Sequence, residues 1–396
     1  MAVLMSTYNG GKFLRQQIDS VLAQKGVPAV ELWVRDDGST DDTKDILNSY
    51  KERGSLQWYT GQNLGPAQSF LDLVRRAPGY DWYAFADQDD FWEPDKLSRA
   101  MDCLRRAGAA QEDTALYFSN AEMVDEKLCS LGRSVYKKAP RTDFRTLACA
   151  GGCLGCTMVF SGALARAIQG KEPPARVVMH DFYVAELCCA LGGRIVFDPE
   201  SRMKYRQHGN NTVGVPHGLR ATLANRVRAI SSVGPTGIAE QAGSLTALYG
   251  GEMESGRLKW LERVARYKRS FFSRLTLALS FRTRYVNLNR SLTIRCAILL
   301  GKDDAKNSRV RPRKTQGVKA EENHEQKHKS ELPFQHVLPS DGLFGAGHYN
   351  AVHRPNAGRR RNRCIQLHLF GGVLLRSCGG DGHDLLRAAD HCLLSE

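Results

Sequence analysis

The stretch Tyr83-Ala-Phe-Ala-Asp-Gln-Asp-Asp-Phe-Trp92 joins an apolar run to three carboxylates within four positions. A short apolar run of this kind predicts a buried strand. Ligands of open α/β sheets bind just outside the carboxyl ends of the strands, which is where Asp87, Asp89 and Asp90 would lie. Asp87 and Asp89 are spaced so that both can face one divalent cation, and Mg²⁺ takes one or two such carboxylates. An acidic turn without a ligand has the same sequence, so this stretch alone leaves both interpretations open.

Strands and helices alternate upstream of this stretch. Strands are predicted over 3–5, 31–35 and 56–59, and apolar residues at helical spacing follow each of them. Such alternation predicts an α/β fold with a mostly parallel, Rossmann-like sheet that helices flank on both faces. The polar turns 6–10, 36–42 and 87–90 would then meet at one edge. Neither a Gly-x-x-x-x-Gly-Lys loop nor a Gly-x-Gly-x-x-Gly fingerprint is present. A nucleotide bound there would therefore be held by turns, acids and a metal.

Two downstream segments add candidate site residues. The apolar run 177–179 ends in His180-Asp181 at the start of a predicted helix. A helix N-cap is the plain structural explanation for Asp181. After a predicted strand at 195–199, the segment Tyr205-Arg-Gln-His-Gly-Asn-Asn-Thr-Val-Gly214 is rich in donors and glycine, which suits phosphate contact. Leu154–Phe160 is predicted as a further strand.

The formal charge of +14 is concentrated in one segment. Residues 251–302 carry 12 Lys and Arg against 3 Asp and Glu, whereas residues 1–250 are almost neutral. This unevenness argues against a nucleic-acid-binding surface on the main domain. Apolar and basic residues interleave over 257–302 in the manner of amphipathic helices that lie on anionic membranes. A solvated face over the core and RNA binding are the alternatives.

The eleven cysteines are scattered in mostly apolar surroundings, and they are expected to be reduced. Cys153 and Cys156 have zinc-ligand spacing, but no second pair accompanies them, so packing is favoured. Without an apolar run long enough to span a bilayer or a signal-like start, we expect a cytoplasmic protein, peripheral on the cytoplasmic face of the membrane. Residues 303–396 lack periodicity, and we interpret them as a disordered or aberrant tail.

Three motifs, taken in order, resemble glycosyltransferase family 2, and within it the bacterial rhamnosyltransferase-type enzymes. They are Met5-Ser-Thr-Tyr-Asn-Gly10, Asp36-Asp-Gly-Ser-Thr-Asp-Asp-Thr43 and Asp87-Gln-Asp-Asp-Phe-Trp92. The resemblance covers residues 2 to about 215 and extends more loosely to 302. It implies a GT-A fold over 1–215, followed by a basic helical region over 216–302. It also implies inverting transfer of a sugar, with rhamnose the first expectation, from a nucleoside-diphosphate donor to a glycan or lipid-linked glycan acceptor.

The resemblance also assigns roles to residues. Asp181 matches the family's catalytic base. A Mg²⁺ or Mn²⁺ ion would be held by Asp87, Asp89 and His208. The donor would be contacted by Ser6, Thr7, Tyr8, Asp36, Asp37, Asp87 and Arg206. Two other function classes stay open: a catalytically silent scaffold, whose partner binding would survive Asp181→Asn, and a nucleotidyltransferase, which would release pyrophosphate from a nucleoside triphosphate. The glycine-rich loop typical of the latter is missing after the first predicted strand.

Overall fold

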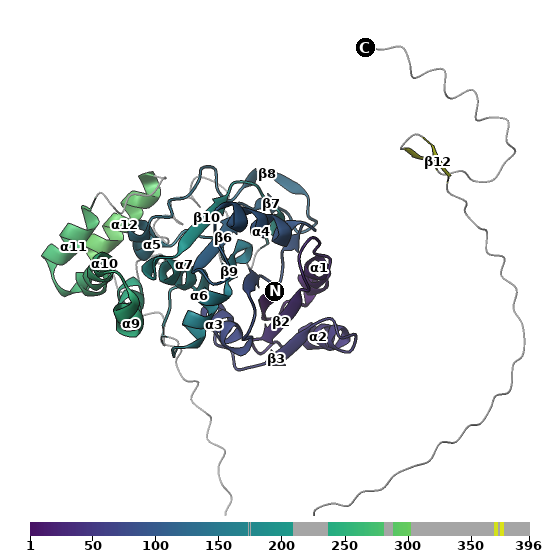
Figure 1. Cartoon of the computed structure of the whole chain (residues 1–396), viewed down its shortest axis with the longest axis horizontal. Helices are drawn as coiled ribbons and strands as arrows, with labels where there is room; N and C mark the ends of the chain where they lie inside the picture. Colours follow the sequence, from purple (N-terminus) through teal and green to yellow (C-terminus); the bar gives the residue numbers. More distant parts are fainter. Residues whose placement is uncertain are drawn as a thin grey trace, which may run out of the picture. The chain divides into compact units, whose positions relative to one another are not determined.

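Strand β1 (Ala2–Thr7) is an inner strand of a seven-stranded sheet in the computed structural model of the protein (Figure 1). The structure describes residues 1–172, 174, 176–208, 237–280 and 288–301, with two short strands at 368–370 and 373–375. The strand order is β10-β6-β9-β4-β1-β2-β3, and only β9 runs antiparallel to its neighbours. The other six are β2 (Glu31–Asp36), β3 (Gln57–Thr60), β4 (Trp82–Ala86), β6 (Ala115–Ser119), β9 (Val159–Ser161) and β10 (Arg194–Asp198).

Both faces of this sheet are covered by helices, because side chains of successive strand residues point to opposite faces. On one face, Val3 and Met5 pack with α1 (Gly11–Leu22), α2 (Thr43–Lys51) and α4 (Lys96–Arg106). On the other, Ala2 and Leu4 pack with α3 (Pro66–Arg76), α6 (Gly162–Gln169) and α7 (His180–Ala190). The predicted fold class is confirmed.

A second, four-stranded sheet was not predicted. Its order is β5 (Phe91–Trp92), β11 (Met203–Arg206), β7 (Glu122–Val124) and β8 (Ser130–Ser134). Strand β11 pairs with β5 directly after the acidic turn. This pairing brings residues 203–208 beside residues 87–92, which lie far earlier in the chain. The second sheet therefore completes the edge at which the acids lie.

Helices α9 (Ile238–Tyr249) and α10 (Ser255–Arg266) extend the core on the α7 side, next to α5 (Phe144–Ala150). Helices α11 (Phe271–Ala278) and α12 (Leu288–Leu300) follow, and all four belong to the same compact unit as the sheet. None of the described helices is both long and apolar enough to cross a membrane. A second unit begins at residue 316, where the structure describes only the antiparallel pair β12 (His368–Phe370) and β13 (Val373–Leu375). The predictions for 216–236 and for the rest of 303–396 lie outside the described residues.

Helix α7 is buried on every side, as expected of a helix enclosed within a core, and it carries an acid there. Glu186 is 1% exposed, and its carboxyl group accepts a 2.5 Å hydrogen bond from the Gln241 amide of α9. Burial raises the pKa of Glu186 to about 8. The folded protein thus keeps a proton on this group that the unfolded chain loses near its ordinary pKa of 4.5.

Replacing Glu186 by Gln is therefore expected to reduce the loss of stability with rising pH. The native state binds more protons than the unfolded state between about pH 4.5 and pH 8, so its stability falls across that window, by at most on the order of 1 kcal/mol per pH unit. Urea unfolding at both ends of the window measures the effect. The exposed Glu52→Gln variant is the control, and equal pH dependence in wild type and both variants would contradict the prediction.

Candidate active site

The turns that end β1, β2 and β4 are tied together by side-chain hydrogen bonds. Thr7 Oγ1 donates to Gln88 Oε1 at 2.6 Å, and the Tyr8 N–H donates to the same oxygen at 2.9 Å. The Asn9 N–H donates to Ser39 Oγ at 2.9 Å, which joins the first turn to the second. The predicted convergence of the three turns at one sheet edge is confirmed. Gln88 was not singled out by sequence reasoning, although it stands between the acids of the quoted stretch.

The acids of the turn after β4 lie close enough to repel one another when they are ionised. Burial, followed by repulsion from Asp89 and Asp181, raises the pKa of Asp87 to about 7. Burial, followed by repulsion from Asp89 and Asp87, raises the pKa of Asp90 well above its usual range. Asp90 Oδ1 accepts from the Arg206 N–H at 3.1 Å, and Oδ2 has no hydrogen-bond partner in the described part of the chain. Raised carboxyl pKa values of this origin mark a place where a cation would be stabilised.

His208 and Arg206 close this edge from the side of β11. His208 Nε2 lies 2.7 Å from Asp89 Oδ2. The buried Arg206 guanidinium donates to the Asp89 carbonyl at 2.7 Å, to Gln16 Oε1 at 2.6 Å and to the Glu126 carbonyl. Arg206 therefore holds the acidic turn against α1 and the loop after β7, which is a positioning role. That it also contacts a donor stays a prediction.

A hard divalent cation fits this set of groups. Asp87, Asp89 and His208 were predicted to hold it, and the structure brings His208 and Asp89 into contact. Ligand atoms of Asp87, Asp90 and Cys156 also lie within 4.8 Å of one another. Mg²⁺ and Mn²⁺ prefer oxygen to thiol ligands, so the side bearing Asp87, Asp89 and His208 is the better match. Cys156 was not foreseen beside the acids, because its sequence neighbours indicate only packing.

Asp181 lies at the first turn of α7, facing the acidic turn closely enough to raise the pKa of Asp87. Its Oδ1 accepts from the Phe182 N–H at 2.6 Å, and the Gly155 N–H also supports the carboxylate. Burial nevertheless raises the pKa of Asp181 to about 6. A carboxylate held in place with such a pKa can accept a proton from a hydroxyl near neutral pH.

The segment before β9 differs from its prediction. Residues 155–157 form a 3₁₀ turn, and the strand is limited to β9. A side chain at Gly155 would stand 2.8 Å from His180 Nε2 and 3.0 Å from Asp181 Cβ, so glycine is required for this close approach. His180 stacks on Phe70 with a ring-centroid distance of 4.0 Å, and burial lowers its pKa to about 3. His180 is thus a neutral packing residue beside the candidate base.

The residues predicted to contact the donor lie at the turns that end the first strands of the sheet. Tyr8 is 48% exposed, whereas Asp36 and Asp37 are buried. Asp36 accepts from the Ser39 N–H at 3.1 Å, and Asp37 accepts from the N–H groups of Leu64 and Gly65 and from Arg35. These bonds shape the turn, and contact of Ser6, Thr7, Tyr8, Asp36, Asp37 and Asp87 with a donor stays a prediction.

The three neighbouring cysteines Cys149, Cys153 and Cys156 are buried on opposite faces of the main sheet. Cys149 and Cys153 are buried in the core that contains α7, whereas Cys156 is buried in the core on the opposite face. Packing is therefore confirmed for Cys149 and Cys153, and the three do not form one zinc site. The cysteines in the described ranges are free thiols, and of these Cys129 and Cys296 are exposed.

Activity is expected to fall on the acid side with an apparent pKa at or below about 6. Asp181 must be ionised to accept a proton, and its pKa is about 6. A divalent cation bound nearby would stabilise the ionised carboxylate and so lower this apparent pKa. The logarithm of kcat/KM against pH, measured at saturating metal, should rise with unit slope and then level. An apparent pKa well above 7 would indicate that a group other than Asp181 must lose its proton for activity.

The acid-lined sheet edge lies within a part of the chain that is similar to glycosyltransferases. More particularly, residues 2–167, less than half of the chain, match the family model described as Glycosyl transferase family 2. The family resemblance drawn from the three motifs is thereby confirmed.

Some of the proteins that this chain resembles are named as glycosyltransferases. The dTDP-rhamnosyl transferase RfbG of Shigella flexneri is 28% identical over 233 residues, which is 55% of this chain and 76% of the relative. TuaG of Bacillus subtilis, a putative teichuronic acid biosynthesis glycosyltransferase, is 34% identical over 113 residues, 28% of this chain and 44% of the relative. The chain spans 59% of an uncharacterised protein of Mycobacterium tuberculosis that it also matches at 26% identity.

Solved structures similar to this chain include that of S. aureus TarS 1-349 in complex with UDP-GlcNAc. It is 17% identical and covers 71% of this chain and 76% of that chain, with a TM-score of 0.44. The mannosyltransferase PcManGT of Pyrobaculum calidifontis, in complex with GDP-Man and Mn²⁺, is also 17% identical. It covers 75% of this chain and 73% of that chain, with a TM-score of 0.42.

Proposed function

We propose that the protein transfers a sugar from a nucleoside-diphosphate donor to a hydroxyl of a glycan or lipid-linked glycan, with inversion at the anomeric carbon. The observation that carries this proposal is that a pair of carboxylates and a third carboxylate on a helix lie close to one another. Asp87 and Asp89 lie at the carboxyl edge of the sheet, and Asp181 faces them from α7. Asp87 and Asp89 could bind a cation together with a diphosphate, and Asp181 could accept the proton of a reacting hydroxyl.

The chemical step is a single in-line displacement. The acceptor oxygen forms a bond to the anomeric carbon, and the bond from that carbon to the diphosphate oxygen breaks. Asp181 takes the proton of the acceptor hydroxyl as the new bond forms. Its carboxylate is held for this by the N–H groups of Phe182 and Gly155. A divalent cation held by Asp87, Asp89 and His208 would, when bound, offset the charge of the leaving diphosphate.

The donor and the acceptor are proposed from the relatives. RfbG is named as a dTDP-rhamnosyl transferase, and we propose rhamnose with a thymidine-diphosphate leaving group as the first donor to test. TuaG is named for teichuronic acid biosynthesis, which supports a growing cell-surface polysaccharide as the acceptor. A lipid-linked acceptor would place the enzyme on the cytoplasmic face of the membrane, in contact with anionic lipid.

The test is donor turnover by the full chain. A panel of nucleotide-sugars is incubated with Mg²⁺ or Mn²⁺, with and without a lipid-linked glycan extract, and free nucleoside diphosphate is measured. We expect metal-dependent release from one donor, accelerated by the acceptor. Release of pyrophosphate from a nucleoside triphosphate instead would favour a nucleotidyltransferase. Absence of any donor binding across the panel would overturn the proposal in favour of a scaffold.

A further inference from the structure

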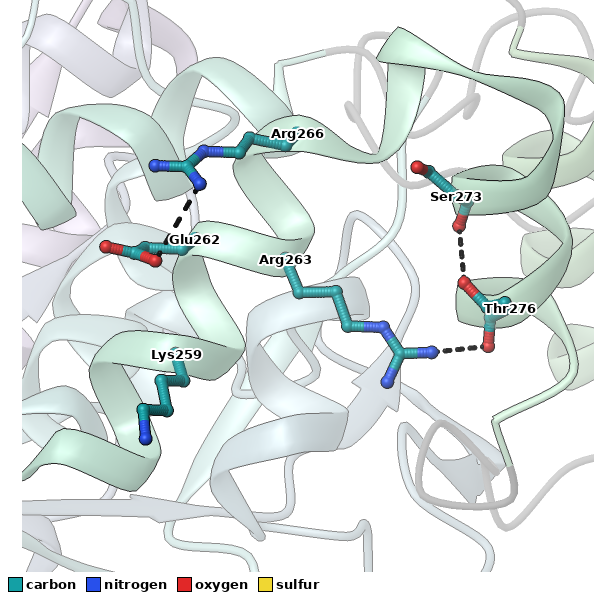
Figure 2. Close-up of a pocket in the computed structure, with 6 residues that line it drawn as sticks. All are labelled: Lys259, Glu262, Arg263, Arg266, Ser273 and Thr276. Carbon is teal, nitrogen blue, oxygen red and sulfur yellow. Dashed lines mark hydrogen bonds and ion pairs between the residues drawn. The ribbon is translucent and has the colours of Figure 1, made fainter.

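Helices α10 and α11 line an open basic pocket (Figure 2). Its volume is about 280 Å³, and its lining residues are Lys259, Glu262, Arg263, Arg266, Ser273 and Thr276. Lys259, Arg263 and Arg266 are spaced so that they share one face of α10. The opposite face of this helix, with Trp260, Leu261 and Val264, is buried in the core. The pocket therefore does not belong to the transfer site at the sheet edge.

The pocket keeps a positive charge after its internal contacts are counted. Arg263 donates to the Thr276 carbonyl at 2.7 Å, which fixes its guanidinium between the two helices. Glu262 lies 4.0 Å from Arg266 and offsets one of the three cations. The hydroxyl groups of Ser273 and Thr276 add small polar groups to the wall (Figure 2). Such a concave set of cations and hydroxyl groups suits an anionic phosphate group.

Large apolar side chains stand out into solvent on the helix that forms one wall. Phe272 is 76% exposed and Leu279 is 59% exposed. Together with Thr276 they occur at spacings of four and three residues, so Phe272 and Leu279, the C-cap residue of α11, flank a pocket residue on one side of this helix. Phe271, the neighbour of Phe272, is 57% exposed and packs edge to face with it. Exposed apolar groups of this size mark an interaction site.

We infer that α10 and α11 form a docking surface for an anionic lipid bilayer. Lipid phosphates would enter the basic pocket, while Phe271, Phe272 and Leu279 would be buried among the acyl chains near the interface. The positive charge of the pocket favours an anionic bilayer as the partner. A second copy of the chain would bring the same cations to the contact, and these would repel one another. The inference rests on the proposed function only for the reason why the protein would dock, which is access to a lipid-linked acceptor. The surface itself is inferred from its charges and exposed apolar side chains.

Two double variants test the two components separately. In Lys259→Gln/Arg266→Gln the pocket loses two cations, and each contributes about fivefold to binding at an anionic surface, so we expect about 30-fold weaker binding. In Phe271→Ser/Phe272→Ser we expect binding at least about tenfold weaker. The control is Lys51→Gln/Arg53→Gln at the end of α2, which removes the same charge at the other end of the domain (Figure 1).

The measurement is sedimentation of the full chain with vesicles of phosphatidylglycerol and phosphatidylcholine in equal parts, compared with phosphatidylcholine alone. We expect binding that needs the anionic lipid, weakens with salt, survives in the control and in Asp181→Asn, and falls in both test variants. Because Asp181→Asn should still bind vesicles, failure of transfer and failure of docking are distinguishable. Unchanged sedimentation of both test variants would overturn the inference. Tighter binding to single-stranded oligonucleotide, or a dimer lost in Phe271→Ser/Phe272→Ser, would also overturn it.

Discussion

Replacement of Asp181 by Asn is expected to slow sugar transfer by about 10²- to 10⁴-fold, the range that a positioned general base contributes. Asparagine keeps the shape of the side chain and its ability to accept from the Phe182 N–H, but it cannot take the acceptor proton. The affinity for the donor should therefore change little. The measurement is the rate of nucleoside-diphosphate release with acceptor present, together with donor binding by calorimetry.

The N-cap of α7 is Met179, so the N-cap explanation for Asp181 is wrong. The matched control separates a base from an acid that only supports the start of a helix. Asp143 caps α5, where its side chain accepts from the Thr146 N–H at 3.1 Å. Asp143→Asn should alter stability slightly and leave the rate unchanged. If Asp181→Asn behaves in the same way, Asp181 is only a structural residue at the start of α7. If partner binding persists in Asp181→Asn in a protein that never turns over a donor, the scaffold interpretation gains support.

Replacement of Asp89 by Ala is expected to weaken metal-dependent donor binding by at least about 100-fold, beyond the usual effect of changing a group that only supports a ligand. The change removes a carboxylate oxygen and also the partner of His208 Nε2. The measurement is calorimetric titration of donor with and without Mn²⁺. Asp45→Ala, on the exposed side of α2, removes the same charge away from the site. Equal donor affinity with and without metal in the wild type and in Asp89→Ala would contradict the proposed cation site.

The order of strands and helices could be predicted from the sequence because local apolar periodicity is strong over residues 1–92. The placement of the acidic turn followed from the same pattern, since an apolar strand ended in it. The second sheet could not be predicted in this way. Strand β11 pairs with β5 through backbone contacts between segments more than a hundred residues apart, and no local pattern encodes such a pairing.

The packing of individual charged residues was predicted less well than their positions. No sequence pattern around Arg206 indicates that its guanidinium donates to carbonyl and amide oxygens around the acidic turn, whereas its contact with a diphosphate stays a prediction. Nothing in the sequence indicates that Lys96 is buried, with its Nζ 3.7 Å from the centroid of the Trp92 ring and a pKa lowered by burial to about 7. Burial decides these outcomes, and it depends on tertiary packing rather than on neighbours in the sequence.

The contact between His208 and Asp89 has a consequence for synthesis on the ribosome. The two residues are separated by 119 positions, so Asp87, Asp89 and Asp90 leave the exit tunnel long before the residues that hold them in place. Until then the acidic turn of the nascent chain lacks its contacts with Arg206 and His208, and for most of that time Asp181 is also missing. Donor binding by an incomplete chain is therefore not expected before residue 208 has emerged, and a ribosome stalled earlier would release a protein without a usable site.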